Sequence, residues 1–117
     1  MPIIKIWCLP PNQSEEKLNA LHNNIVKAVT GIKELELKSE KDLTNLFVPD
    51  LMQYGLGTEI VIEITGLFLK LERTCEVRNR LAKAVGEAVK SLYPDTEKIE
   101  CLIYSFNPAD GFWTSAE

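Results

Sequence analysis

The sequence has few of the residues on which disulfide and metal sites depend. Its 117 residues contain only three cysteines and one histidine, and no two cysteines form a Cys-x-x-Cys pair. An odd and scattered set of this kind predicts neither a disulfide framework nor a thiolate zinc site, and the single histidine has no partner ligands. We therefore expect reduced, mostly buried thiols, as in an intracellular protein.

An excess of positive charge is also missing. The 13 basic residues are outnumbered by 17 acidic ones, which gives a formal net charge of −4 at pH 7. This balance argues against a phosphate-tracking surface, so we expect no nucleic-acid partner. No apolar run is long enough to span a membrane, and the first one is interrupted by Lys5 and by Pro10-Pro11, unlike a signal peptide. The expectation is a cytoplasmic protein without a membrane partner.

An internal repeat organises the chain. With an offset of 56 residues, the alternating apolar residues of 4–8 fall on those of 60–64, and the helical stretch 21–29 falls on 77–85. Within the helical stretches "IVKAV" aligns with "LAKAV", and further on "LTNLFVP" aligns with "IECLIYS". Each half, about 1–57 and 58–117, is therefore predicted to be a β-α-β unit of one single domain.

The helix boundaries can be predicted from capping residues. Ser14 is expected to cap the first helix and Gly31 to end it. The second helix is expected to begin near Glu72 and to stop at Pro94. Its predicted buried face consists of Val77, Leu81, Val85, Ala88 and Leu92. The two glycines of "QYGLGT" predict a turn between the halves.

The repeat also predicts how the elements are arranged. Parallel strands of a β-α-β unit need a right-handed crossover, so two units side by side give an α+β fold: a four-stranded mixed sheet with both helices on one face. Strand-like segments such as "EIVIEITGL" are apolar on both alternating sets, which is typical of a sheet covered on both faces. Two helices cover only one face, so we predict a homo-oligomer.

Pro2 stands directly behind Met1 at the start of the first strand. One interpretation is structural, because a proline has no amide hydrogen for a strand ladder and suits the first strand position. The other is chemical. Methionine before a small residue is commonly removed, and removal would leave Pro2 as a free secondary amine. Such an amine acts as a base at neutral pH if burial and nearby cations lower its pKa.

Three stretches make the sequence similar to a known family: "MPIIKI", "VPDLMQYGLG" (48–57) and "NPADGFW" (107–113). Together with the repeat they resemble the tautomerase superfamily, and within it the macrophage migration inhibitory factor and 5-carboxymethyl-2-hydroxymuconate isomerase type. The resemblance implies a homotrimer with active sites at subunit boundaries. It also implies keto-enol chemistry on a small carbonyl acid without metal or cofactor, in which the Pro2 nitrogen takes a proton from carbon and returns it elsewhere.

The resemblance further suggests substrate-binding residues. Arg73 matches the strand-to-helix junction at which an arginine of 4-oxalocrotonate tautomerase binds carboxylate, and Lys70 is the alternative at this junction. Lys38 falls on a substrate-side lysine when positions are counted back from Val-Pro-Asp. In the tail, Phe112 or Trp113 would close the pocket of a neighbouring subunit. The competing interpretation of all these residues is a surface or packing role.

Glu100 departs from the family pattern, because relatives have a pocket tyrosine or arginine at this position. A carboxylate there would repel an anionic substrate, orient a water for hydration chemistry, or simply pair with Lys98, Lys5 or the proline ammonium. Two alternatives to an enzyme therefore stay open. One is a non-catalytic trimeric binding protein of the same fold, and the other is an unrelated ferredoxin-like α+β sandwich.

Overall fold

The computed structural model describes residues 1–50 and 58–116. Within these residues the elements follow in the order β1 (Ile3–Leu9), α1 (Glu15–Thr30), β2 (Thr44–Pro49), β3 (Glu59–Phe68), α2 (Cys75–Leu92) and β4 (Lys98–Phe106). Short 3₁₀ turns lie at Lys33–Leu35, Glu40–Asp42 and Pro108–Asp110. The predicted turn "QYGLGT" falls, up to Gly57, outside the described residues.

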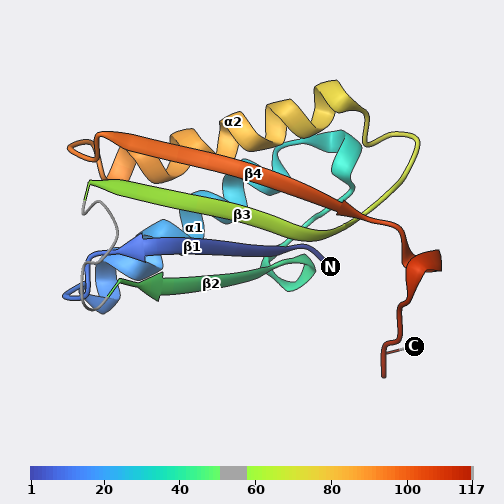
Figure 1. Ribbon diagram of the computed structural model, residues 1–117, viewed down its shortest axis with the longest axis horizontal. Coiled ribbons are helices and arrows are strands. Elements are labelled where there is room, and N and C mark those ends of the chain that lie inside the picture. The colour runs from blue at the N-terminus through green and yellow to red at the C-terminus, as the bar shows by residue number, and fades with distance from the viewer. Residues whose placement is uncertain (51–57, 117) are drawn as a thin grey trace.

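The four strands form one mixed sheet in the order β2-β1-β3-β4. β1 pairs with β2 and β3 pairs with β4 in parallel, whereas the central strands β1 and β3 are antiparallel. Each helix connects two parallel neighbours, and both helices lie on the same face of the sheet (Figure 1). The predicted α+β sheet with two helices on one face is confirmed.

Helix α1 begins and ends where its capping residues predict. The Ser14 hydroxyl accepts a hydrogen bond of 3.1 Å from the Lys17 amide, which satisfies one of the free amides of the first turn. Gly31 follows the last helical residue, and its amide donates to the Lys27 carbonyl. The local signals in the sequence therefore suffice for this helix.

Helix α2 begins at Cys75, three residues later than predicted from Glu72. The reason is a tight turn in which the Arg73 amide donates to the Lys70 carbonyl at 3.0 Å. Thr74 then acts as the N-cap, and its side chain accepts from an amide one turn further on. The junction between β3 and α2 is thus a separate structural segment, and Arg73 belongs to it rather than to the helix.

The hydrophobic core fills the space between the helices and one sheet face. Most of the repeated positions predicted as apolar point into it from both halves. Cys8, expected to match Ile64, is not part of the core, because a register shift between Trp7 and Leu9 buries Leu9 instead. In α2 Val89 is buried where Ala88 was expected. The core residues of the strands and helices that are fully or almost fully buried include Ile4, Ile6, Leu21, Ile25, Val29, Ile60, Ile62, Ile64, Val77, Leu81, Val85 and Val89.

The opposite face of the sheet, here called the outer face, has no described element over it (Figure 1). Four residues stand side by side across this face, one from each strand. Lys5 and Glu63 are in the middle, and Leu46 of β2 and Leu102 of β4 lie next to them at the edges. Leu46, Leu102 and Tyr104 are 44, 41 and 51% exposed. These large apolar side chains in contact with water are a typical feature of an association surface.

Candidate active site

A pocket of about 250 Å³ lies at the end of the sheet where β1 begins and β3 ends. Figure 1 shows the N-terminus at this end, close to the point where the chain leaves β3 for α2. We call it the Pro2 pocket. Its lining residues are Met1, Pro2, Leu35, Glu36, Leu37, Asp42, Phe68, Lys70 and Arg73.

Pro2 is held in a buried position by two neighbouring strands. Its carbonyl accepts the Thr44 amide at 3.0 Å, so β2 fixes one side. On the other side Gly66 of β3 adopts φ +72, beside a register shift between Ile64 and Leu67. A Cβ at Gly66 would lie 3.1 Å from the Met1 carbonyl oxygen, so only glycine leaves room for the N-terminal segment.

Replacing Gly66 by alanine tests this close approach. In protein that retains Met1, a Cβ at a positive φ and against the Met1 carbonyl should lower the free energy of unfolding by about 1–3 kcal/mol, and after Met1 removal the positive φ remains as the cause. The matched control is Gly86→Ala within α2, where an added Cβ meets nothing within 4 Å. That change should raise the free energy by about 0.5–1 kcal/mol, because alanine favours a helix. Urea unfolding of both variants measures the difference, and equal effects would contradict the packing described.

The electrostatics of the Pro2 pocket favour an unprotonated amine. Burial lowers the pKa of the N-terminal amine from its ordinary 8.0, and the positive charges of Arg73 and Lys70 lower it further, while Asp42 opposes them. In the structure this amine belongs to Met1, whose side chain is exposed, whereas Pro2 is buried. Removal of Met1 would therefore place the terminal nitrogen where desolvation disfavours the charged form more strongly.

Arg73 is a buried cation without an acidic partner. It is 7% exposed, and its Nη1 and Nη2 donate to the carbonyls of Phe68 and Leu35, each at 2.9 Å. Its Nε is buried without a hydrogen-bond partner, and none of the ion pairs within the described part of the chain involves it. Burial lowers the pKa of this guanidinium, and the negative charges of Glu36 and Glu72 oppose this shift. A buried charge that forms no ion pair is costly, which makes Arg73 a candidate for a role in the site.

Lys70 is the second cation of the pocket, and it is held quite differently. Its side chain is exposed, and the ion pairs found among residues 1–50 and 58–116 do not include it. The Lys70–Arg73 turn brings both side chains to the same pocket. The pocket thus contains one fixed and one free positive charge.

The segment between α1 and β2 contributes carboxylates that the sequence did not reveal. Asp42 accepts the amides of Lys38 and Ser39 at 2.7 and 3.2 Å, and these hydrogen bonds, the first above all, lower its pKa. Glu36 also lines the pocket, in a left-handed conformation with φ 58. Both residues lie in the mixed-charge run "KELELKSEKD", which has no helical or strand periodicity and so gave no signal.

The other residues predicted for substrate binding do not line the Pro2 pocket of their own chain. Lys38 is exposed on a neighbouring surface groove that it shares with Lys33. Phe112 packs edge-on against Phe68, with ring centroids 5.0 Å apart, and so supports the pocket wall from behind. Trp113 is 84% exposed in the tail that extends from β4 (Figure 1). A substrate role of these residues stays a prediction.

Glu100 also lies outside the pocket, on the outer face. It pairs with Val61 in the strand register and forms an ion pair of 2.6 Å with Lys98. Of the three interpretations given for this residue, the structure contains the pairing with Lys98. Any contact of Glu100 with a substrate would have to involve the site of another subunit.

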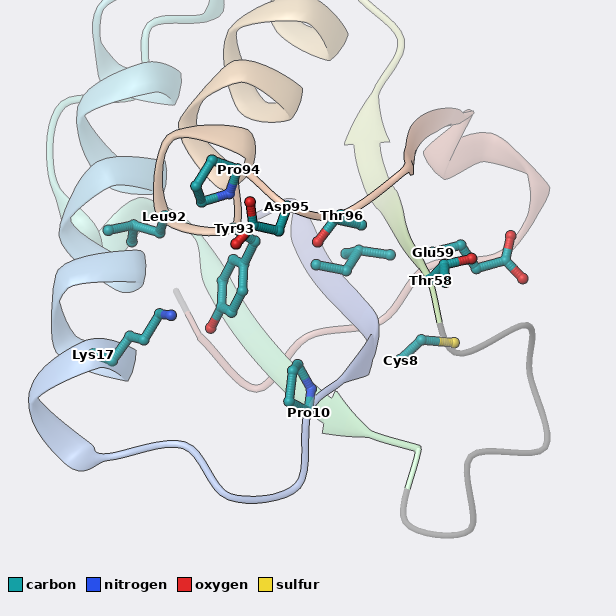
Figure 2. A pocket seen from close by; sticks show the side chains of 11 residues that line it. Cys8, Pro10, Lys17, Thr58, Glu59, Leu92, Tyr93, Pro94, Asp95 and Thr96 are labelled. Atoms are coloured by element: carbon teal, nitrogen blue, oxygen red, sulfur yellow. The ribbon is translucent and has the colours of Figure 1, made fainter.

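A second pocket, of about 300 Å³, lies at the opposite end of the sheet (Figure 2). It is lined by Cys8, Pro10, Lys17, Thr58, Glu59, Ile60, Leu92, Tyr93, Pro94, Asp95 and Thr96. In Figure 2 the Lys17 side chain points towards Tyr93, and its ammonium lies 4.4 Å from the centre of that ring. The Tyr93 hydroxyl donates to the Gln13 side chain at 2.7 Å.

The 56-residue offset relates this second pocket to the first. Thr58 takes the position of Pro2, and Lys17 takes that of Arg73. A threonine within the chain has no amine to offer, and burial followed by nearby acidic residues raises the pKa of the Cys8 thiol, which keeps it protonated. Of these two pockets, only the Pro2 pocket lies at the terminal amine; the titratable groups of the second pocket include the carboxylates of Glu59 and Asp95.

Two further observations concern residues 1–50 and 58–116. No cluster of three or more histidine, cysteine, aspartate or glutamate side chains in this part of the chain is arranged to hold a metal ion. In the same residues, neither helix combines the length and the apolar character that crossing a membrane requires.

No protein-family model and no curated protein matches the sequence. Solved structures do match. A fused 4-oxalocrotonate tautomerase solved as an asymmetric trimer has a TM-score of 0.76 and 16% identity, over 98% of this chain and 94% of that one. A protein inactivated by 2-oxo-3-pentynoate has a TM-score of 0.73 and 16% identity, over 97% and 93%. A malonate semialdehyde decarboxylase inhibited by 3-bromopropiolate has 0.64 and 21%, over 98% and 89%. These similarities show the fold, and the resemblance drawn from the sequence is confirmed at that level.

Proposed function

We propose that this chain, whose fold is that of the tautomerase superfamily, is an enzyme that moves a proton between carbon and oxygen on a small carbonyl acid, with the Pro2 nitrogen as general base. The observation that supports this most is the shared pocket of buried Pro2, Arg73 and Lys70. Burial and both cations lower the pKa of the Met1 amine, and the same surroundings would act on the Pro2 amine once Met1 is removed. Among the described residues, neither Arg73 nor Lys70 forms an ion pair with an acidic side chain. A base and a cation next to each other are what enolate chemistry needs.

The reaction follows from these groups. After Met1 is removed, the unprotonated Pro2 nitrogen accepts the proton of a substrate O–H or C–H, and the electron pair delocalises as an enolate. The positive charge of Arg73, which is itself buried, stabilises the negative charge of the enolate. The protonated Pro2 then returns the proton to the other atom. No net charge is gained or lost, so the amine is ready for the next turnover.

The substrate is proposed to be small and acidic. A pocket of about 250 Å³ is below the ~300–1,000 Å³ typical of drug-sized ligands. Two structures with the same fold were obtained with small acids, 2-oxo-3-pentynoate and 3-bromopropiolate. Phenylenolpyruvate and 2-hydroxymuconate are suitable first substrates, and the purified protein should convert their enol forms to ketones faster than buffer does.

We also propose a homotrimer. The exposed apolar side chains of the outer face need a cover, and one of the similar structures is a trimer. In such an assembly Glu100, on the outer face, and the exposed Trp113 of the tail are the residues expected to meet neighbouring subunits. The predicted roles of Phe112 and Trp113 at a subunit boundary belong to this proposal.

A non-catalytic binding protein of the same fold is the alternative, and one observation favours it. Met1 lines the Pro2 pocket, and the Thr44 hydroxyl contacts its sulfur at 3.3 Å. If Met1 is retained, Pro2 has an amide nitrogen, which is not basic. Mass spectrometry of untagged protein decides between the two: loss of one methionine supports the enzyme, and a retained Met1 supports the binding protein.

The pH dependence of catalysis tests the electrostatics of the pocket. A general base works unprotonated, so kcat/KM should rise with pH and level off above the pKa of the amine. Burial, Arg73 and Lys70 lower the pKa of the Met1 amine from 8.0, and we expect the same surroundings to act on the Pro2 amine once Met1 is removed, so the midpoint should lie below 8.0. Lys70→Met removes one of the like charges and should move the midpoint upward. A midpoint above 8.0 in the unaltered protein would contradict the proposal.

A further inference from the structure

The two cations of the Pro2 pocket differ in what their side chains already bind. We propose that they divide the work: Lys70 binds the carboxylate of the substrate, and Arg73 is a positioning residue that holds the pocket walls and provides a fixed charge. This inference rests on the proposed function. It reverses the assignment suggested by the resemblance, in which Arg73 is the leading carboxylate ligand.

The guanidinium of Arg73 is committed to the protein. Nη1 and Nη2 each donate to a backbone carbonyl, one at the end of β3 and one at the end of the 3₁₀ turn Lys33–Leu35. A carboxylate is best bound by the two parallel N–H groups of an arginine fork. The Nε–H group has no hydrogen-bond partner but is itself buried, so a fork made of Nε and one Nη could reach a ligand only if the guanidinium moved. Moving it would leave the buried carbonyls of Phe68 and Leu35 without these donors, which is unfavourable. Binding substrate through Arg73 would thus weaken the site.

The same two hydrogen bonds explain what Arg73 does instead. Phe68 and Leu35 are both lining residues of the Pro2 pocket, and they come from segments 33 residues apart in the sequence. Arg73 ties these segments together across the pocket, and at 7% exposure it has little surface left for a ligand. Its charge nevertheless acts on the amine, because charges in a poorly solvated site are weakly screened.

Lys70 has the opposite properties. Its ammonium is exposed and forms no ion pair with an acidic side chain in residues 1–50 and 58–116. Its backbone is fixed, since the Lys70 carbonyl closes the turn with the Arg73 amide at 3.0 Å. A flexible side chain on a fixed backbone can reach a carboxylate at the pocket mouth without breaking any bond of the folded protein. A lysine also serves as a point charge that accepts varied geometries.

A ligand that binds without reacting separates this inference from catalysis. Benzoylformate is a 2-oxo acid with no hydrogen on the carbon beside its ketone, so it cannot enolise. Its methyl ester is one methyl group larger and carries no charge. Dissociation constants of both, measured by NMR titration of the Met1-free protein, give an acid-to-ester selectivity that reports the interactions of the carboxylate, and the variants below assign them to a residue.

The variants are Lys70→Met, Lys70→Arg and Arg73→Lys. The matched control is Lys83→Met, because Lys83 is an exposed lysine of α2 that does not line the Pro2 pocket. Lys70→Met should weaken benzoylformate binding tenfold or more, because about 1.5–3 kcal/mol is typical of a charged hydrogen bond, and leave the ester within about twofold. Lys70→Arg should keep the affinity for the acid close to that of the unaltered protein. Lys83→Met should change the affinity for neither ligand. Arg73→Lys should weaken acid and ester alike and lower the midpoint of unfolding, since a lysine cannot bond both carbonyls.

The opposite pattern would overturn the inference. It is wrong if Lys70→Met leaves benzoylformate binding unchanged, if Arg73→Lys selectively weakens the acid, or if the unaltered protein shows no preference for the acid over the ester. Acid-selective binding that depends on Lys70, in a protein without tautomerase activity, would support the inference while removing the proposed function. Tautomerase activity with an unchanged KM in Lys70→Met would support the proposed function and contradict the inference about Lys70.

Discussion

Replacing Pro2 by alanine should lower kcat/KM for phenylenolpyruvate at least tenfold, and we expect a decrease of about a hundredfold, the lower end of what a positioned acid-base group contributes. Alanine is also small, so Met1 removal is retained and a terminal amine remains. That amine is primary and no longer held in a ring, so its nitrogen can rotate away from the substrate. The loss should appear mainly in kcat, because the cations that attract the acid are unchanged.

The matched control for this variant is Pro11→Ala. Pro11 is exposed on the bend after β1, at the other end of the same strand. Its replacement changes the proline content equally but leaves the Pro2 pocket intact, so the rate should be unchanged. Equal rates for Pro2→Ala and the unaltered protein would remove the proposed mechanism. A loss in Pro11→Ala of the same size would show that the effect is one of folding rather than of catalysis.

Most of the fold could be predicted from the sequence because the signals for it are local and repeated. Ser14 and Gly31 bound α1 as expected, and the apolar residues 56 positions apart face one core. The start of α2 was misplaced because a polar junction has no periodicity. The turn closed by the Arg73 amide on the Lys70 carbonyl delays the helix, and Thr74, a residue type favoured at N-caps, was the signal in the sequence for this later start.

The candidate site could be predicted in part. Pro2, Arg73 and the alternative Lys70 were named from the sequence, and the structure brings all three to one pocket. That Arg73 is tied to carbonyls from distant segments could not be predicted, because a buried guanidinium and an exposed one have the same sequence signal.

Other lining residues have signals of different strength. Asp42 and Glu36 come from an irregular segment whose side chains are arranged by tertiary contacts. Gly66 did have a usable signal: a glycine within the strand-like run "ITGLF" often marks a bulge or a close backbone approach.

Replacing Leu102 by aspartate should convert the proposed trimer into single chains. Leu102 is 41% exposed on the outer face and stands opposite Glu63 in the strand register. In an isolated chain the end of this side chain can reach water, and Leu102 is not among the buried core residues, so the fold should persist. In an assembly it would bury a charge beside other acidic side chains, which costs several kcal/mol unless the charge is paired. Light scattering should report about three chains per particle for the unaltered protein and one for the variant.

The control for the assembly is Leu71→Asp. Leu71 is 94% exposed, the highest value among the large apolar side chains described, but it lies in the β3–α2 junction outside the sheet. If exposure of any leucine were enough to drive association, both variants would dissociate. If the outer face is the interface, only Leu102→Asp does. An unaltered protein that is monomeric at micromolar concentration would contradict the argument from sheet coverage, and the apolar outer face would then need a partner of another kind.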